Sequence, residues 1–200
     1  MKRAAAGLVT FLWPLAVMAQ DPSFDCDKAQ SGAEEAVCGS SGLASLDVET
    51  DRLFTLALNG PNMTDARADE LRAYQRGWLK GRNDCWKADD QGDCVRDSYA
   101  IRIDELRRDY ADARAEDGPS LGPFAYVCDG LDAGVSATFI NTDKPLAVLR
   151  WGETVHVLPQ AISASGARYE AQDGTVFWSK GDDGTLTFEG QDYSCRGDGT

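Results

Sequence analysis

The stretch ADARAEDGPSLGP, residues 111–123, separates two parts of the sequence whose apolar residues repeat with different periods. It is charged, it contains glycine and proline, and it has no apolar periodicity, which is typical of a linker. Before it, apolar residues recur at helical spacing; after it, they alternate as in strands. The sequence therefore predicts a helical domain at 20–112, a linker at 113–122 and a β domain at 123–200.

The helical part contains three amphipathic segments, so we expect a small all-α domain of about three helices. Thr64 can cap the second helix, and Lys80 and Arg82 lie outside its stripe, on the side expected to face solvent. The stripes are Leu43, Leu46, Leu53 and Ala57 within 43–58; Leu71, Tyr74 and Trp78 within 64–85; and Val95, Tyr99, Ile103, Leu106 and Tyr110 after a polar loop at 87–93. Each helix would pack into a shared core through one face.

The β part holds seven or eight short alternating runs within fewer than 80 residues, separated by Gly, Asn, Asp or Pro turns. So many short strands predict an antiparallel barrel or sandwich, because a closed sheet leaves no exposed edge. We expect an all-β antiparallel barrel of about eight strands. A bridge between Cys128 in the first run and Cys195 in the last would help to hold so small a core.

The first 19 residues have the features of a secretory signal peptide. Lys2 and Arg3 precede an apolar run that is too short to span a bilayer, and small residues precede an expected cleavage after Ala19. The first cysteine, Cys26, lies seven positions beyond Ala19, so we expect no lipid attachment there. The sequence predicts export to the periplasm with no stable membrane anchor after cleavage.

The net charge restricts the kinds of partner. The formal charge of −13 becomes −15 when Lys2 and Arg3 leave with the signal peptide. Such an excess disfavours nucleic acid and favours encounter with a basic partner. Acidity that serves solubility alone is an equally acceptable interpretation.

No motif indicates catalysis, a metal or a cofactor. The single histidine, His156, lies in an alternating run without a nucleophile motif near it. Six cysteines in an exported chain favour disulfides over zinc ligands or nucleophiles. The carboxylate clusters at 89–93 and 182–183 lack the order of a calcium loop and are typical of solvated turns. We therefore expect no enzymatic activity, no metal and no cofactor.

Residues 124–196 resemble the membrane-bound and periplasmic inhibitors of c-type lysozyme, the MliC/PliC family of small eight-stranded barrels from Gram-negative bacteria. The resemblance is carried by YVC at 126–128, SGARY at 165–169, FWSKG at 177–181 and the closing Cys195-Arg196. In that family a loop serine and a turn lysine enter the lysozyme cleft and meet its two catalytic carboxylates. The binding residues that the resemblance implies are Ser165, Gly166, Arg168, Tyr169, Lys180 and Gly181. Taken singly, these are also ordinary turn, core and strand residues, and only their shared spacing favours a binding role.

The chemistry of such a site is consistent with inhibition. A glycosidase needs one protonated and one ionised carboxyl group, and a cation between them favours the doubly ionised, inactive form. Lysozymes of this type are basic, so an acidic inhibitor would be attracted to them. The partner implied is therefore a c-type lysozyme.

Residues 24–110 resemble the LprI-type lysozyme-inhibitor domain through FDC at 24–26, E-x-A-V-C ending at Cys38 and QRGWLKGRNDC at 75–85, followed by Cys94. This resemblance implies no site residue. Four cysteines allow three pairings, and the short loops favour Cys26–Cys38 with Cys85–Cys94.

The function predicted from the sequence is inhibition of c-type lysozyme in the periplasm by insertion of a serine loop and a lysine turn. A non-inhibitory envelope-binding module and a carboxylate-dependent envelope hydrolase remain as alternatives. Because each half has its own cysteines, we expect the barrel to fold and to act without residues 20–112. Nothing in the sequence indicates an oligomeric state.

Overall fold

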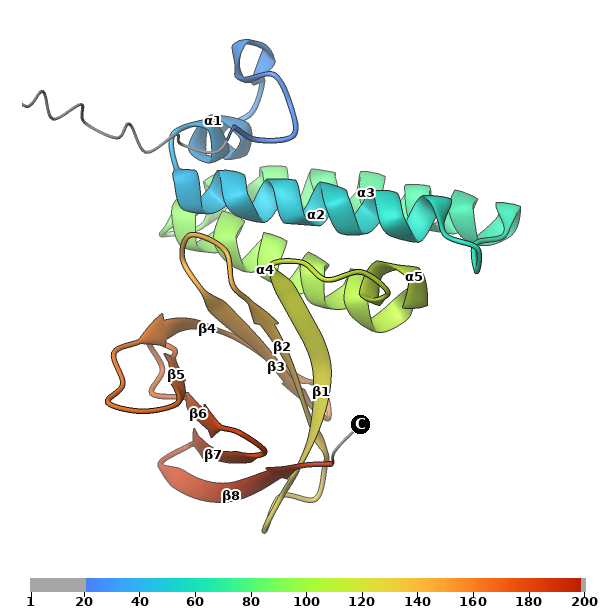
Figure 1. Cartoon of the computed structure of the whole chain (residues 1–200). Coiled ribbons are helices and arrows are strands. Elements are labelled where there is room, and N and C mark those ends of the chain that lie inside the picture. Colours follow the sequence, from blue (N-terminus) through green and yellow to red (C-terminus); the bar gives the residue numbers. More distant parts are fainter. Residues whose placement is uncertain (1–20, 199–200) are drawn as a thin grey trace, which may run out of the picture.

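A layer of helices covers one side of a closed β-barrel (Figure 1). The computed structural model describes residues 21–198. Its helices are α1 (Gly32–Cys38), α2 (Ser41–Asn59), α3 (Asp65–Asn83), α4 (Gln91–Asp109) and α5 (Ala111–Arg114), with 3-10 turns η1 (Cys26–Lys28) and η2 (Asp84–Lys87). The three long helices are those that the apolar stripes predicted, and the short α1 and α5 are additional.

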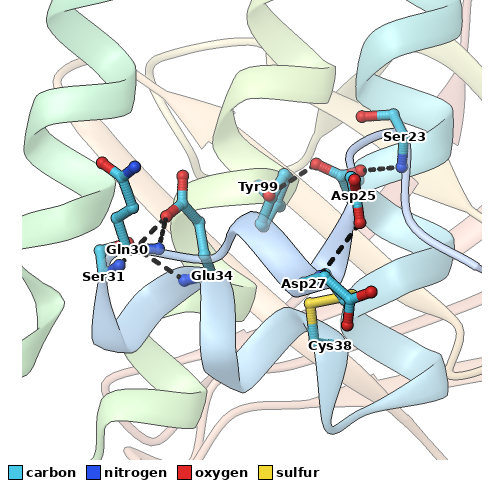
Figure 2. The surroundings of a disulfide bond; sticks show 10 residues. Ser23, Asp25, Asp27, Gln30, Ser31, Glu34, Cys38 and Tyr99 are labelled. Atoms are coloured by element: carbon cyan, nitrogen blue, oxygen red, sulfur yellow. Dashed lines mark hydrogen bonds between the residues drawn. A yellow bond between two sulfur atoms is a disulfide. The ribbon is translucent and has the colours of Figure 1, made fainter.

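Side-chain caps fix where the first four helices begin. Ser31, Ser40, Thr64 and Asp90 each accept a hydrogen bond from a backbone N–H in the first turn of the following helix. At α1 the cap is reciprocal: Ser31 Oγ accepts from the Glu34 N–H, and Glu34 Oε2 accepts from the Ser31 N–H at 3.1 Å (Figure 2). Each such cap is worth about 1 kcal/mol of helix stability.

The prediction that Arg82 faces solvent is wrong, because the residue is buried. Its side chain is 3% exposed and donates to the hydroxyl group of Tyr99, which donates in turn to Asp47 Oδ1 at 2.8 Å. The guanidinium group also lies over the rings of Trp78 and Tyr99. The face of α3 that packs against α4 therefore follows Leu71, Trp78 and Arg82, and Tyr74, expected in the stripe, is 61% exposed.

Eight antiparallel strands in sequence order form the barrel, and β1 pairs with β8 to close it. This confirms the predicted fold class. The strands are β1 (Ser120–Cys128), β2 (Val135–Ile140), β3 (Leu146–Trp151), β4 (Thr154–Ala161), β5 (Ala167–Glu170), β6 (Val176–Lys180), β7 (Asp183–Phe188) and β8 (Gln191–Gly197). The barrel core includes Leu149, Leu158, Phe177 and Leu186, none of which is exposed.

The six cysteines form three disulfides: Cys26–Cys38, Cys85–Cys94 and Cys128–Cys195. The first two close short loops in the helical part, and Figure 2 shows the surroundings of the first. The third joins β1 to β8 across 67 residues of chain, at the seam where the barrel closes.

The two halves of the chain share an interface that is apolar at its centre and contains buried charges. Ile140, Leu146 and Val148 of the barrel belong to the same buried cluster as the helical core. Asp104 of α4, 1% exposed, accepts from Thr138 Oγ1 at 2.6 Å and from Arg150 Nε. The helices and the barrel therefore pack as one body.

The segment expected to be a linker is structured at both ends. Helix α5 ends at Arg114 with Ala113 fully buried, and β1 begins at Ser120. Ser120 is also fully buried and donates to the carboxylate of Glu49 on α2.

Candidate functional site

The serine loop (residues 162–166, between β4 and β5) and the lysine turn (residues 180–183, the end of the β6–β7 hairpin) lie side by side. Strands β5 and β6 pair with Ala167 opposite Ser179, so the register continues with Gly166 beside Lys180. Two segments separated by 13 residues of sequence are thus neighbours because a single hairpin, β5–β6, joins them. The structure brings Ser165, Gly166, Lys180 and Gly181 together at one surface.

Gly166 makes this close approach possible. Its φ of +68° lies in the left-handed region that favours glycine. A Cβ at this position would lie 2.4 Å from the carbonyl oxygen of Ser179 and 3.2 Å from Cβ of Lys180. A side chain at this position would therefore push the serine loop away from the strand that carries the lysine.

Two hydrogen bonds fix the backbone of the serine loop. The carbonyl oxygen of Ser165 accepts from the indole Nε1 of Trp178 at 2.9 Å and from the hydroxyl group of Ser163 at 2.7 Å. The local sequence pattern does not identify Ser163 and Trp178 as supports of the loop. The only signal was that Trp178 lies within the FWSKG motif, two positions before the lysine.

The lysine turn presents an exposed cation. Lys180 pairs with Asp183 across a two-residue hairpin whose first turn residue, Gly181, has a φ of +62°. The carbonyl oxygen of Asp182 accepts from the N–H of Gly197 at 2.7 Å, which ties the turn to β8. Within residues 21–198 the ammonium group of Lys180 forms no ion pair.

Arg168 and Tyr169 follow the serine loop on opposite faces of β5. Arg168 is partly exposed on the outer face and donates to Glu170 at 3.0 Å. Tyr169 is 3% exposed in the barrel core, 5.5 Å from the ring of Phe139, and burial raises the pKa of its hydroxyl group. Tyr169 therefore lies beneath the surface that Ser165 and Lys180 form.

The surroundings of His156 are those of a structural histidine. Its ring stacks on Trp151 with centroids 5.1 Å apart, and Nδ1 lies 3.4 Å from a carboxylate oxygen of Asp173. Among residues 21–198, no group of three or more His, Cys, Asp or Glu side chains is arranged to hold a metal ion.

Two expectations about export concern the start of the chain. The predicted signal peptide, residues 1–19, lies outside the described residues. None of the helices that the structure describes is both long enough and apolar enough to cross a membrane.

Comparison with known proteins gives consistent matches for both halves. The model of the family described as "Membrane-bound lysozyme-inhibitor of c-type lysozyme" (MliC) matches residues 126–194, which include the serine loop and the lysine turn. The lipoprotein LprI of Mycobacterium tuberculosis and that of Mycobacterium bovis are each 32% identical over 176 residues, which cover 87% of this chain and 83% of theirs.

One solved structure is also similar. It is Pseudomonas aeruginosa MliC in complex with hen egg white lysozyme, with 28% sequence identity and a TM-score of 0.35. The match covers 41% of this chain and 87% of that one.

Proposed function

The chain belongs to the family of the lipoprotein LprI, and from this premise we propose that it is a periplasmic inhibitor of c-type lysozyme and not an enzyme. The observation that carries the proposal is the contact between the serine loop and the lysine turn through Gly166. Both segments lie in the region that matches the model of the lysozyme-inhibitor family. In this proposal Ser165 and Lys180 enter the active-site cleft of the enzyme together.

Lys180 is suited to neutralise two carboxylates. It is exposed at the end of β6, and its ammonium group is a compact charge with three donors. Placed between the general acid and its ionised partner, the cation lowers the pKa of the acid and blocks the position of the substrate. The hydroxyl group of Ser165 can donate to or accept from a carboxyl group in either protonation state.

The backbone around both residues is already ordered, which favours affinity. Trp178 and Ser163 hold the serine loop, and Gly197 holds the lysine turn. Binding therefore requires little further ordering of the loops, and this lowers the entropic cost of association. The charge of −15 in the mature chain favours approach to a basic enzyme and predicts that association weakens as salt is added.

The direct test is the rate at which hen egg white lysozyme clears a suspension of bacterial cell walls in the presence of the mature chain, residues 20–200. We expect stoichiometric inhibition. Replacing Lys180 with Ala should weaken binding by about 2 kcal/mol, roughly 30-fold in Kd, as for a central interface residue.

Lys80→Ala is the matched control, because it removes the same charge from an exposed position on α3. It should leave inhibition unchanged. Absence of inhibition by the unaltered chain at micromolar concentration would refute the proposed function. Equal affinities for the unaltered chain and Lys180→Ala would refute the role of the lysine turn.

A further inference from the structure

A hollow at the surface of the barrel adjoins the lysine turn. Its lining includes three aromatic residues, Phe124, Tyr126 and Phe139, together with Gly181 and Asp182 of the turn itself. We refer to it as the aromatic hollow. The hollow and Lys180 are neighbours at the end of β6, because Ser179 and Gly181, on either side of the lysine, line the hollow.

The aromatic wall of the hollow is connected to the barrel core through contacts between rings. The ring centroid of Phe139 lies 5.9 Å from that of Phe124 and 5.5 Å from that of Tyr169. Contacts between rings therefore extend from the exposed Phe124 into the barrel core. Phe124 is 37% exposed because the pairing of β1 with β2 shifts register between Leu121 and Phe124. Such a bulge redirects side chains.

Helix α4 supports this bulge from the other side. Arg107 donates from Nε to the carbonyl oxygen of Gly122 at 2.8 Å, inside the shifted segment. Arg107 is itself 4% exposed. The position of the Phe124 ring therefore depends on the helical layer as well as on the barrel.

Two acidic residues line the hollow, Asp182 in the lysine turn and Asp198 after β8. Burial raises the pKa of the Tyr126 hydroxyl group, and the negative charge of Asp182 raises it further, which places that carboxylate near the tyrosine. Of the cations in the neighbouring strands, Arg196 pairs with Asp183 and Arg168 pairs with Glu170. The carboxylate of Asp182 forms no ion pair within the described chain.

From this combination we propose that the aromatic hollow binds an arginine side chain of the partner enzyme. The inference rests on the proposed function and deepens it, because it adds a second specific contact beside Lys180. A guanidinium group is planar and always charged, so it can stack on Phe124 or Phe139 while it donates to carboxylate oxygens. An apolar side chain would leave the carboxylate of Asp182 without a partner, and a basic enzyme offers cations at its surface.

The proposed contact and the lysine turn have opposite polarity. Lys180 presents a cation to carboxylates of the enzyme, and the neighbouring hollow presents carboxylates to a cation of the enzyme. Two adjacent contacts of opposite sign define one orientation of the inhibitor, because a rotated complex would place like charges together.

The test is calorimetric titration of hen egg white lysozyme with the mature chain and its variants. Asp182→Asn preserves the shape of the turn and removes its charge, and Phe124→Ala removes the exposed ring. Each should weaken Kd by about tenfold, and the effect of Asp182→Asn should shrink at high salt. Asp132→Asn, the same change at an exposed position in the loop between β1 and β2, should leave Kd within about twofold.

The outcomes separate this inference from the proposed function. If the unaltered chain inhibits and Asp182→Asn has no effect, the arginine contact is refuted and the inhibitor function stands. An effect of Phe124→Ala alone refutes it too, since that result indicates an apolar occupant. If the unaltered chain does not bind lysozyme, titration with N-acetyl-arginine amide still tests the hollow. NMR shifts at Phe124 and Phe139 that disappear in Asp182→Asn would support it, and their absence would overturn it.

Discussion

Gly166 is the residue on which the geometry of the candidate site depends most directly. Two separate features of this position require glycine: its backbone conformation and the lack of space for a side chain. The φ of +68° disfavours any side chain by about 1–2 kcal/mol. The carbonyl oxygen of Ser179, 2.4 Å from the position of a Cβ, belongs to the backbone and cannot move aside without displacing β6.

We therefore expect Gly166→Ala to separate the serine loop from the lysine turn and to weaken lysozyme binding by about tenfold or more, measured by calorimetry. Gly174→Ala is the matched control. Gly174 has a φ of +87° in the turn between β5 and β6, and a Cβ there would meet nothing within 4 Å. If the two variants weaken binding equally, backbone strain alone is responsible and the contact between loop and turn is not required.

At the scale of secondary-structure elements, strand pairing determines which segments become neighbours. The β5–β6 pairing brings the serine loop to the lysine turn, and the β1–β8 pairing closes the barrel. Within residues 21–198, three residue pairs form the register between β1 and β8, and one of them is the disulfide pair Cys128 and Cys195. This disulfide closes a much longer loop than the two in the helical part, so it should restrict the unfolded chain more.

Replacing both Cys128 and Cys195 with Ser should lower the free energy of unfolding by about 4 kcal/mol, measured by urea denaturation. The double replacement of Cys26 and Cys38, which are 12 residues apart, should cost about 3 kcal/mol. We also expect only the barrel variant to weaken inhibition, because the seam carries Gly197, which holds the lysine turn. A helical-domain variant that loses more stability than the barrel variant would contradict this order.

The helical layer and the barrel form one structure at the scale of the whole molecule. That the barrel folds and inhibits without residues 20–112 stays a prediction, and the shared interface sets its cost, because the deletion would expose Ile140, Leu146 and Val148. It would also remove Asp104, leaving the guanidinium group of Arg150 without its carboxylate. We therefore expect the isolated barrel to be less stable than the full chain, with its β2–β4 face exposed to water.

Asp104→Ala tests this coupling in the full chain. Removing one partner of a buried ion pair typically costs about 3–5 kcal/mol, and we expect a loss of that order in urea denaturation. Unfolding followed at Trp78 in the helices and at Trp151 in the barrel should occur in a single coincident transition. Two separate transitions would show that the halves unfold independently.

Asp143→Ala is the control for this interface. Asp143 accepts from the hydroxyl group of Ser41 at 2.7 Å, also between barrel and helix, but at an exposed position. Its removal should cost less than about 1 kcal/mol. A similar loss from both variants would mean that burial of Asp104 adds nothing to the coupling.

The sequence by itself determined the features that depend on local pattern. Apolar periodicity predicted the long helices and the eight strands, because burial of one face requires regular spacing along the chain. The SGARY and FWSKG motifs singled out Ser165 and Lys180, and glycines beside both residues indicated tight backbone geometry. The short helices α1 and α5 have too few residues to show a period, so the pattern did not reveal them.

Only the tertiary structure decided the features that depend on contacts between distant residues. Arg82 is charged and adjacent to solvated positions, yet the hydroxyl group of Tyr99 and the ring of Trp78 give it a buried environment that no local pattern encodes. The same holds for the partners of Asp104 in the barrel, Thr138 and Arg150, which are 34 and 46 residues away. The aromatic hollow likewise combines residues from β1, β2, β6 and the lysine turn with the chain after β8. Closure of the barrel creates this hollow, because it brings the two ends of the β domain together.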